Sequence, residues 1–512
     1  MPLITLPATG QYGVLADQAA QELPLNAWSG VRNMRFRDGY SERFGGEAPI
    51  FTAPSITPYW LAPYTTSTAR FWVHAGLQKV FVDDGTTRTE ITPGTLFTGA
   101  QDDRWTGGSL NGVLVMNNGK DQPQFWGGNI ASDLATLTGW NANWRAASVR
   151  PFKNYLVALD LTKAGTRYPH MVKWSHVADP GTVPTSWDES NAALDAGEQD
   201  LAETPDLLVD QLPLGDMNVV YKERSMYAMQ YIGQPFIWRF SRLPGDVGML
   251  ARGCAVATPQ GHVVLTAGDV ILHSGQGPQS LLTGRMRRWL FNNLDSTNYR
   301  RAFVTANPNK NEVWVCFPAV GASVCTLALV WNWADNTLGV RDLANVSYGA
   351  FGQINYAAAN SWNADTETWD DDGTAWNQDE YSPADARLLL AAATPQVLLV
   401  DTSATFNGAP IAATLERTGM AFDDPYSVKM LRAVYPRVDA AAGTQLSIEV
   451  GASMDAERAP VWQPPVTYTV GSSLKADTFA TGRFLALRIR SSGKQPWRLK
   501  SIDLDIVKQG AY

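Results

Sequence analysis

The sequence lacks the residue patterns on which most catalytic and metal sites are built. Its five histidines, at positions 74, 170, 176, 262 and 273, are scattered without the spacing of metal ligands. It contains no GxSxG, no HExxH, no Walker loop and no GxGxxG that opens a helix. We therefore predict a protein that is not an enzyme, with no catalytic residue, no metal and no cofactor.

Cysteine is scarce as well. The three cysteines, Cys254, Cys316 and Cys325, form no CxxC pair, and an odd number does not suit a framework of disulfides. Free cysteine behaves as a small hydrophobic residue and is among the most often buried. We expect all three to be reduced and packed inside the protein.

Long apolar runs are absent. The N-terminus, MPLITLPATGQYG, has no basic start followed by an apolar stretch, and no segment approaches the roughly 20 apolar residues of a membrane span. The sequence therefore predicts a chain that is made and kept in a cytoplasm, with no membrane insertion.

Charge is low and unevenly distributed. Charged residues make up 18% of the chain and the net charge is −8, which argues against a surface built to neutralise phosphates with Lys and Arg. From Ser427 to the end there are 12 basic and 7 acidic residues, or +5, which leaves −13 for the remainder. This asymmetry predicts a separate C-terminal module.

The dominant pattern is short apolar runs bounded by Gly, Asn and Asp, which is typical of brief strands joined by tight turns. Residues 69–92, ARFWVHAGLQKVFVDDGTTRTEIT, predict a complete three-stranded meander. In it, Asp84 and Gly85 are expected to supply the positive φ angles of a two-residue hairpin. Chain length and 45% hydrophobic content indicate more than one packed unit.

Comparable meanders recur about every 40 to 60 residues, as in the blades of a propeller. We predict an all-β protein with a β-propeller-like body of repeated antiparallel meanders at 50–426, preceded by an extended N-terminal segment at 1–49. A small C-terminal β-sandwich at 427–512 is predicted from alternating runs such as RFLALRIRS. Six tryptophans in or beside the meanders should pack between blades: Trp72, Trp126, Trp174, Trp238, Trp314 and Trp331.

An acidic insertion at about 355–386 interrupts this pattern. Residues 361–380 hold Trp362, Trp369 and Trp376 among seven carboxylates, three of them at Asp370, Asp371 and Asp372, with no Lys or Arg. Asp371 to Trp376, DDGTAW, is similar to part of the sialidase Asp-box, a structural motif that occurs once here. We interpret the insertion as a structural loop of tandem turns. Three uses stay open: a solvated surface, contact with a partner or subunit, or cation binding, although DxDxDG spacing is absent.

Several blocks occur in the order seen in one family of proteins. They are LNAWSGVRNMRFRDGYSERFGG, VVYKERSMYAMQ with FIWRFSRL, ARGCAVATPQGHVVLTAGDVILHSG, NEVWVCFP with TLALVWNWADNTL, and LSIEVGASMD with FLALRIRSSGKQPWRLKSIDLDIV. Together they cover most of the chain. In this order the chain resembles the tail hub, or nozzle, proteins of short-tailed phages (the podovirus tail tubular or stabilisation proteins).

The resemblance implies a structural virion protein, assembled in the host cytoplasm. Such a protein forms a homohexameric ring that serves as the distal DNA-ejection conduit and lets genomic double-stranded DNA pass without specific binding. Its expected partners are a portal-adaptor protein above, tailspikes or fibres at the side, and a tail plug or needle below.

The candidate interface of such a ring combines two sets of residues. One is the acidic tryptophan insertion. The other is the N-terminal arginine group, Arg32, Arg35, Arg37 and Arg43, which either clamps an acidic neighbouring subunit or forms ordinary solvated or intrachain pairs. The alternative function is a propeller-type tail protein that binds or hydrolyses a glycan.

Overall fold

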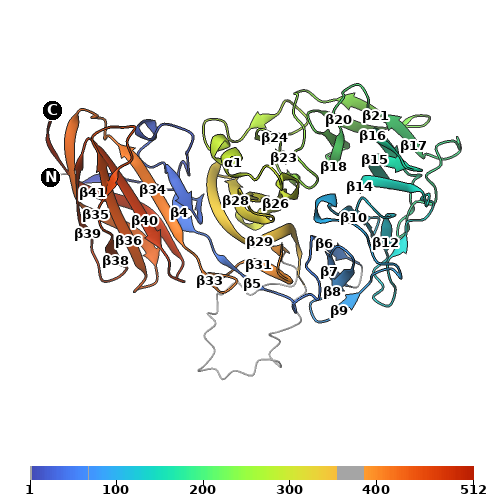
Figure 1. The fold of residues 1–512 in the computed structure, drawn as a ribbon, viewed down its shortest axis with the longest axis horizontal. Helices are drawn as coiled ribbons and strands as arrows, with labels where there is room; N and C mark the ends of the chain where they lie inside the picture. The colour runs from blue at the N-terminus through green and yellow to red at the C-terminus, as the bar shows by residue number, and fades with distance from the viewer. Residues whose placement is uncertain (1–2, 67–68, 355–385, 512) are drawn as a thin grey trace, which may run out of the picture.

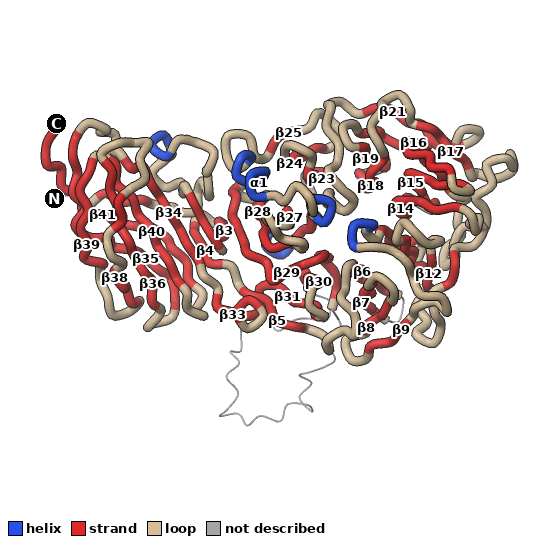
Figure 2. The backbone as a smooth tube through the Cα atoms, viewed as in Figure 1, coloured by secondary structure: helices blue, strands red, loops and turns tan. Residues whose placement is uncertain are grey.

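The computed structural model describes residues 3–66, 69–354 and 386–511. A ring of small antiparallel sheets forms one end of the molecule and a β-sandwich forms the other, with both chain termini at the far edge of the sandwich (Figure 1). Strands dominate the described residues, and helix is confined to a few short segments (Figure 2). These segments are α1 (Arg287–Asn293) and the 3-10 turns η1 (Ala20–Glu22), η2 (Gln101–Asp103), η3 (Tyr299–Arg301) and η4 (Pro308–Lys310).

Five blades of the ring are separate four-stranded antiparallel sheets, each built from consecutive strands. Blade 1 consists of β6 (Trp60–Thr65), β7 (Arg70–Ala75), β8 (Val80–Asp83) and β9 (Arg88–Glu90). Blade 2 consists of β10 (Thr106–Leu110), β11 (Val113–Asn117), β12 (Gln124–Trp126) and β13 (Ala135–Thr136). Blade 3 consists of β14 (Trp144–Phe152), β15 (Tyr155–Lys163), β16 (Thr166–Trp174) and β17 (Gly197–Asp200).

Blades 4 and 5 repeat this arrangement. Blade 4 consists of β18 (Leu208–Leu214), β19 (Met217–Lys222), β20 (Met226–Gly233) and β21 (Ile237–Arg242). Blade 5 consists of β22 (Ala255–Thr258), β23 (Gly261–Leu265), β24 (Val270–His273) and β25 (Gln279–Ser280). Blade 6 follows with β26 (Phe303–Asn307), β27 (Glu312–Phe317), β28 (Cys325–Asn332) and the first part of β29 (Thr337–Gln353).

The ring closes through a strand from the start of the chain. The second part of β29 pairs with β30 (Ala386–Ala392), which pairs with β31 (Gln396–Ser403), and β31 pairs with β5 (Gly46–Pro49). Because β5 immediately precedes blade 1, blade 7 combines strands from the two ends of the ring. Blade 7 is followed by two short strands, β32 (Thr405–Phe406) and β33 (Ala409–Pro410).

Apolar cores fill the spaces between successive blades. The first strands of blades 2 to 7 contact one another in sequence, and β29 contacts β6, which places these strands around the axis (Figure 1). Buried clusters join blades 1 and 2, 2 and 3, 3 and 4, 4 to 6, 6 and 7, and 7 and 1. All six tryptophans expected between blades lie in these clusters, at most 7% exposed. Stacking the meanders hides both faces of each sheet and leaves only short edges, which confirms the propeller-like body.

The β-sandwich packs two sheets around one core. The first sheet holds β2 (Gly30–Arg32), β34 (Ala413–Met420), β40 (Phe484–Ser491), β36 (Gln445–Ser453), β37 (Val461–Trp462) and β38 (Val466–Thr469). The second is continuous with blades 6 and 7 through the pairing of β3 with β29, and it holds β3 (Met34–Arg37), β4 (Tyr40–Arg43), β41 (Trp497–Ala511), β35 (Ser427–Ala440), β39 (Ala476–Gly482) and β1 (Ile4–Leu6). In β40, Leu485, Leu487 and Ile489 are fully buried while Arg490 is exposed, which confirms the predicted alternation.

The predicted domain boundaries differ from the structure at both ends of the chain. Residues 1–49 are not a separate extended segment, since β1 to β4 belong to the sandwich and β5 belongs to the ring. The C-terminal part of the sandwich begins at Ala413 and not at 427. The cause is pairing between remote strands: Ile4 lies opposite Leu504, and Val31 lies opposite Leu415. Three- and four-residue strands that pair across several hundred residues leave no local pattern to find.

The meander at 69–92 is confirmed, but its second turn is longer than predicted. Asp83 pairs with Arg88, so the connection is a four-residue loop at 84–87, in which Gly85 has a positive φ of 95° and Asp84 does not. The Asp84 carboxylate accepts hydrogen bonds from the backbone N–H groups of Thr86 and Thr87 at 2.8 and 2.7 Å. These bonds outweigh the effect of burial and lower the pKa of Asp84 to about 2.

We expect Asp84→Ala to lower the free energy of unfolding by about 1 kcal/mol, because it removes the acceptor of two local backbone donors that water then solvates. Urea denaturation of the variant at neutral pH measures the loss. Asp133→Ala is the control: it changes an exposed loop aspartate outside blade 1 for which the described residues show no such bonds, and it should cost less. If Asp84→Ala leaves the free energy of unfolding unchanged, or lowers it by several times the expected amount, a purely local role for Asp84 is contradicted.

Candidate functional site

The structure places the four arginines of the predicted interface in different surroundings. Arg35 and Arg43 are only 3% and 2% exposed, so the prediction that they present an intersubunit surface is wrong for these two. Arg43 donates to the carbonyl oxygens of Gly493 and Lys494 within the sandwich. Arg37 pairs with its near neighbour Glu42 at 2.8 Å.

Arg32 is the one member of this group with a largely solvent-accessible side chain, 63% exposed, and it pairs with Asp342 at 2.7 Å. The pair therefore links β2 of the sandwich to β29 of the ring within one chain. The remaining predicted interface residues, Trp362, Trp369, Asp370, Asp371, Asp372 and Trp376, lie outside the described residues.

Arg35 belongs to a buried ionic cluster, which we call the seam cluster: Arg35, Glu47, Glu312, Arg341 and Asp401. Arg35 donates to both carboxylate oxygens of Asp401 at 2.7 and 2.8 Å and lies 3.3 Å from Glu312. Arg341 pairs with Glu47, and its Nη1 lies 3.6 Å from Asp401. The cluster joins β3 of the sandwich, the closing strand β5, blade 6 and blade 7, so it holds the ring closed at the point where the sandwich attaches.

Burial dominates the electrostatics of the seam cluster. Arg341 and Glu47 are both 0% exposed, and the guanidinium carbon of Arg341 lies 4.6 to 5.2 Å from the ring centroids of Trp314, Phe44 and Phe406. Burial would raise the pKa of Asp401, but the two guanidinium groups outweigh it and hold that pKa below its ordinary value. For Glu47 burial prevails over Arg341 and raises the pKa.

A second polar cluster lies on the axis of the ring, around Asp210 at the start of blade 4. Asp210 accepts two bonds from Arg150 of blade 3 at 2.7 Å each, one from Ser148 at 2.8 Å, and one from the backbone N–H of Gly253 at 3.1 Å. Burial would raise the pKa of Asp210, but the charge of Arg150 outweighs it and lowers that pKa. One carboxylate thus ties together blades 3 and 4 and the segment that enters blade 5.

Two further arginines cross the axis beside Asp210. Arg252, just before β22, donates through Nη1 to carbonyl oxygens at the entrance of blade 2 and in blade 3 at 2.5 and 2.8 Å. Arg104, just before β10, donates through Nη1 to carbonyl oxygens at the entrance of blade 6 and in blade 7 at 3.2 and 3.4 Å. The acceptors are the carbonyl oxygens of Asp103, Ala147, Arg301 and Ser347. Since these bonds run between opposite sides of the ring, side chains close its axis at this end.

Blades 4 and 5 share a buried network of one tyrosine and two histidines. The hydroxyl of Tyr221 lies 2.7 Å from both His262 Nδ1 and His273 Nε2, and His262 Nε2 lies 2.8 Å from the carbonyl oxygen of Pro213. A carbonyl only accepts, so His262 carries its proton on Nε2 and accepts from Tyr221 at Nδ1. The tyrosine oxygen then accepts from His273 Nε2. Every partner is satisfied with both rings neutral, and burial lowers the pKa of each histidine to about 4.

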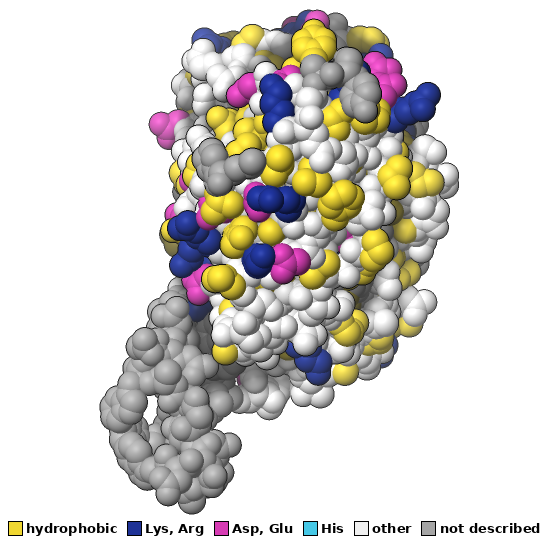
Figure 3. Space-filling model, turned by 90° about the vertical axis from the view of Figure 1, so that its left-hand side faces the viewer, with side chains coloured by type: hydrophobic (Ala, Val, Ile, Leu, Met, Phe, Trp, Pro, Cys, Tyr) yellow, Lys and Arg dark blue, Asp and Glu magenta, His cyan; other side chains and the backbone are white. Residues whose placement is uncertain are grey.

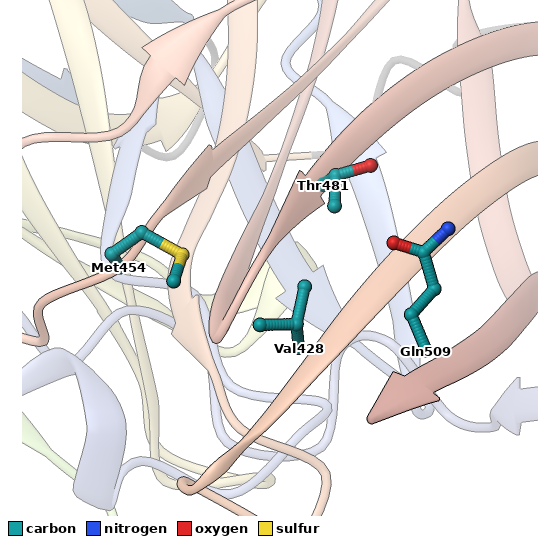
Figure 4. A pocket seen from close by; sticks show the side chains of 4 residues that line it. All are labelled: Val428, Met454, Thr481 and Gln509. Carbon is teal, nitrogen blue, oxygen red and sulfur yellow. The ribbon is translucent and has the colours of Figure 1, made fainter. Parts of the chain in front are cut away.

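The sandwich exposes large apolar side chains. Figure 3 views the molecule from the sandwich end and shows hydrophobic side chains spread among charged ones across that face. Six large hydrophobic residues of the sandwich are at least 46% exposed: Leu3, Tyr426, Met454, Val461, Leu474 and Phe479. One of them, Met454, lines a surface hollow of about 630 Å³ together with Val428, Thr481 and Gln509. In this hollow Val428 lies between Met454 and Gln509 (Figure 4).

The register of the second sheet explains why part of this surface is apolar. Phe479 and Thr481 lie on one face of β39, and Thr481 pairs with Met430, which in turn pairs with Val507. The next residue along each of β39 and β35 faces the core, as the full burial of Ala480 and Leu431 shows. Because β39 is the last strand of its sheet, Phe479, 60% exposed, stands at an open edge. We call Phe479, Met430, Val507 and the adjacent hollow the sandwich apolar surface.

A second exposed apolar group lies on the β20–β21 hairpin of blade 4, at the end of the molecule away from the sandwich (Figure 1). Tyr231, Ile232 and Phe236 are 50%, 50% and 73% exposed. Beneath them is a hollow of about 340 Å³ whose lining includes Trp238 and Arg239. The two ends of the molecule therefore both expose large apolar side chains.

The three cysteines are free and buried, as predicted. Burial raises the pKa of Cys254 and of Cys325 to about 12, so these thiols stay protonated and unreactive at neutral pH. Within the described ranges, no group of three or more His, Cys, Asp or Glu side chains is arranged to hold a metal ion. In the same ranges no helix is long and apolar enough to cross a membrane.

Sequence reasoning missed the seam cluster, the axial cluster and the Tyr221 network. The bonded pairs in them are 41 to 366 positions apart, and a single arginine or histidine in a strand carries no local signal of its remote partner. One signal was available: Glu312 begins an otherwise apolar strand, EVWVCF, and a charged residue in such a strand is seldom buried unless it is paired.

The fold defines an all-β protein with a propeller-like body and a β-sandwich. No model of a known protein family matches the chain, and no curated protein matches it at a significant level. Among solved structures, the WD40 β-propeller domain of Doa1 is similar, with a TM-score of 0.35 and 10% sequence identity over 70% of this chain and 98% of that domain. At this level the likeness says nothing about ligands or partners, and the description of the fold here follows from the strand pairing itself.

Proposed function

We propose that this chain is a structural virion protein, a tail hub or nozzle subunit of a short-tailed phage that assembles into a ring of identical copies, six in number. The order of its sequence blocks, which resembles that of tail hub proteins, supports the assignment. The architecture supports it as well. The ring of blades and the sandwich are both tightly packed, and their buried polar groups join strands to one another.

The observation that carries the proposal is the sandwich apolar surface. An open edge strand with a protruding Phe479 favours pairing with another chain, and monomeric proteins usually protect such edges. The charge asymmetry supports a copy of the same chain as the partner. The stretches that hold the sandwich strands, 1–45 and 413–512, contain 17 basic and 14 acidic residues, or +3, while 46–412 contain 24 basic and 35 acidic residues, or −11. A basic sandwich set against the acidic body of the next copy gives a head-to-tail contact that closes into a ring.

The DNA path in this proposal lies between copies and not through a single propeller. Arg104 and Arg252 cross the axis of each ring of blades, so that axis is not a route for a duplex. A wall made mainly of the acidic bodies would repel a passing duplex and not hold it.

Partners beyond the ring would use surfaces that the ring leaves open. The hairpin group of Tyr231, Ile232 and Phe236 is a candidate contact for a tailspike or fibre at the side. A portal-adaptor protein above and a tail plug or needle below complete the proposed surroundings.

We expect Phe479→Glu to abolish or strongly weaken ring formation, because it places a carboxylate in the apolar contact at the edge of β39. Native mass spectrometry should show the wild type near six times 55.9 kDa and the variant as the 55.9 kDa chain. Val320→Glu is the matched control: it changes an apolar side chain that is 69% exposed on the ring body and should leave the assembly intact.

Loss of assembly in both variants, or in neither, would contradict the assignment of the contact to the sandwich apolar surface. A wild-type protein that is monomeric and releases reducing sugar from a surface glycan would instead support a glycan-hydrolysing tail protein and exclude the tail hub.

A further inference from the structure

Two arginines on the axis, Arg104 and Arg252, have guanidinium N–H donors without a hydrogen-bond acceptor in the described residues. Both side chains reach across the ring from opposite sides, and Arg104 Nη2 lies beside Gly253, the neighbour of Arg252 in the chain. Each guanidinium group has five N–H donors. In both residues only Nη1 has hydrogen-bond partners within the described chain, and those partners are carbonyl oxygens. The guanidinium carbon of Arg104 also lies 5.7 Å from the ring centroid of Tyr348.

Arg104 is 8% exposed, and its Nη2 is buried without a hydrogen-bond partner in the described residues. A buried guanidinium nitrogen without an acceptor costs the desolvation of a charged group. Burial lowers the pKa of Arg252 and the positive charge of Arg104 acts in the same direction, while the carboxylates of Asp210, Asp160 and Asp103 act against it. These carboxylates do not fully offset the burial of the charged guanidinium group.

The carboxylates nearby are engaged elsewhere. Asp210 is held by the bidentate bond from Arg150 and by Ser148 and Gly253. Asp102 pairs with Arg301 at 2.7 Å. Asp103 lies 3.3 Å from Lys120 and accepts the backbone N–H of Ala100. Asp160, which also acts on Arg252, is held by Arg167 at 2.7 Å. In the described part of the chain, neither Arg104 nor Arg252 has a carboxylate within ion-pair distance.

Two other buried arginines, Arg43 and Arg417, likewise have no ion pair in the described residues, and each has a buried Nε without a hydrogen-bond partner there. Arg43 and Arg417 also donate to carbonyl oxygens, at the ends of strands and turns. Each of them is a single guanidinium group that satisfies its local backbone. On the axis two groups share one region, and they approach it from opposite blades.

We propose that the axial arginine pair binds a small oxyanion, such as a phosphate or a carboxylate, at the closed end of the ring. A tetrahedral or planar anion accepts several charge-assisted hydrogen bonds at once, and the forked donors of arginine match that geometry. Bound there, the anion accepts from Arg104 and Arg252 together and neutralises both charges. It also links blades 2 and 5 across the axis, so its occupancy stiffens the ring.

The test measures binding to the purified full chain with two probes, inorganic phosphate and succinate, each against chloride at equal ionic strength. We expect one probe ion to bind per chain in calorimetry and to raise the midpoint of thermal unfolding. Arg252→Gln and Arg104→Gln should each weaken the affinity about tenfold or more, the loss expected for a charge-assisted contact. Arg224→Gln, an exposed arginine on the same body, is the charge-matched control and should bind as the wild type does.

Which probe binds more tightly distinguishes a phosphate from a carboxylate ligand, and either result supports the site. If neither probe binds the wild type, or if both axial variants bind as tightly as the wild type, the inference is overturned. For each variant, the measured quantity is the rise in the midpoint of thermal unfolding with the probe ion relative to chloride. A general loss of stability in Arg252→Gln therefore cannot be mistaken for a loss of the site. Arg252→Lys keeps the charge without the fork and should retain weak binding.

Discussion

Replacing Arg341 with methionine is expected to lower the free energy of unfolding by about 3–5 kcal/mol, the cost of removing one partner of a fully buried ion pair. Glu47 would remain at 0% exposure without its counter-charge, and Asp401 would lose one of its two guanidinium neighbours. The side chain would also leave the three aromatic rings that surround it. Urea denaturation followed by tryptophan fluorescence measures the loss, since Trp314 lies beside the site.

The matched control is Arg32→Met. Its pair with Asp342 joins the same two bodies, but the arginine is 63% exposed, so the cost should stay within about 1 kcal/mol. Replacing both seam partners, Arg341→Met with Glu47→Leu, should recover much of the loss, because no buried charge is then left unpaired. Equal losses for the Arg341 and Arg32 variants would contradict the role given to the seam cluster.

Stability is expected to fall steeply as the pH drops from about 6.5 to about 4. Three buried histidines are neutral in the folded protein: burial lowers the pKa of His262 and His273 to about 4 and that of His74 to about 3. In the unfolded chain each has an ordinary pKa near 6.5. The unfolded state therefore binds more protons in this window, and the free energy of unfolding rises with pH through it.

At pH 5 each of the three histidines should cost about 2 kcal/mol relative to pH 7, and urea midpoints at the two pH values measure the difference. His74→Leu is the informative variant, because both ring nitrogens of His74 lack partners in the described chain and its ring packs against Phe51. Between pH 7 and pH 5, the free energy of unfolding of this variant should fall by about 2 kcal/mol less than that of the wild type. A wild-type midpoint that does not change from pH 7 to pH 5 would show that these residues are protonated in the folded state.

Much of the fold could be predicted from the sequence because its signals are local. The alternation in residues 483–491 and the presence of a turn at Asp84, although not its length, each depend on a few adjacent residues, and the meanders can only be buried by stacking. The tryptophans between blades follow from the same argument, since a large apolar side chain in a meander has no other place to be buried.

The parts that could not be predicted depend on remote pairing. Nothing in the segment around Arg35 shows that Asp401 lies opposite, so the arginine group looked like a surface feature when two of its members are buried. The strands of residues 4–43 are too short to signal the sheet that they join, and their partners lie at the other end of the chain. The axial cluster needs the ring to be closed before Arg104 and Arg252 meet at all.

The claim on which the account most depends is that copies of this chain form a ring around a shared opening. Electron microscopy of the purified wild-type protein tests it most directly. The account predicts six-fold particles with a central opening, in which the sandwich of each copy contacts the body of the next. Single, isolated chains under conditions where the protein is fully folded would contradict it.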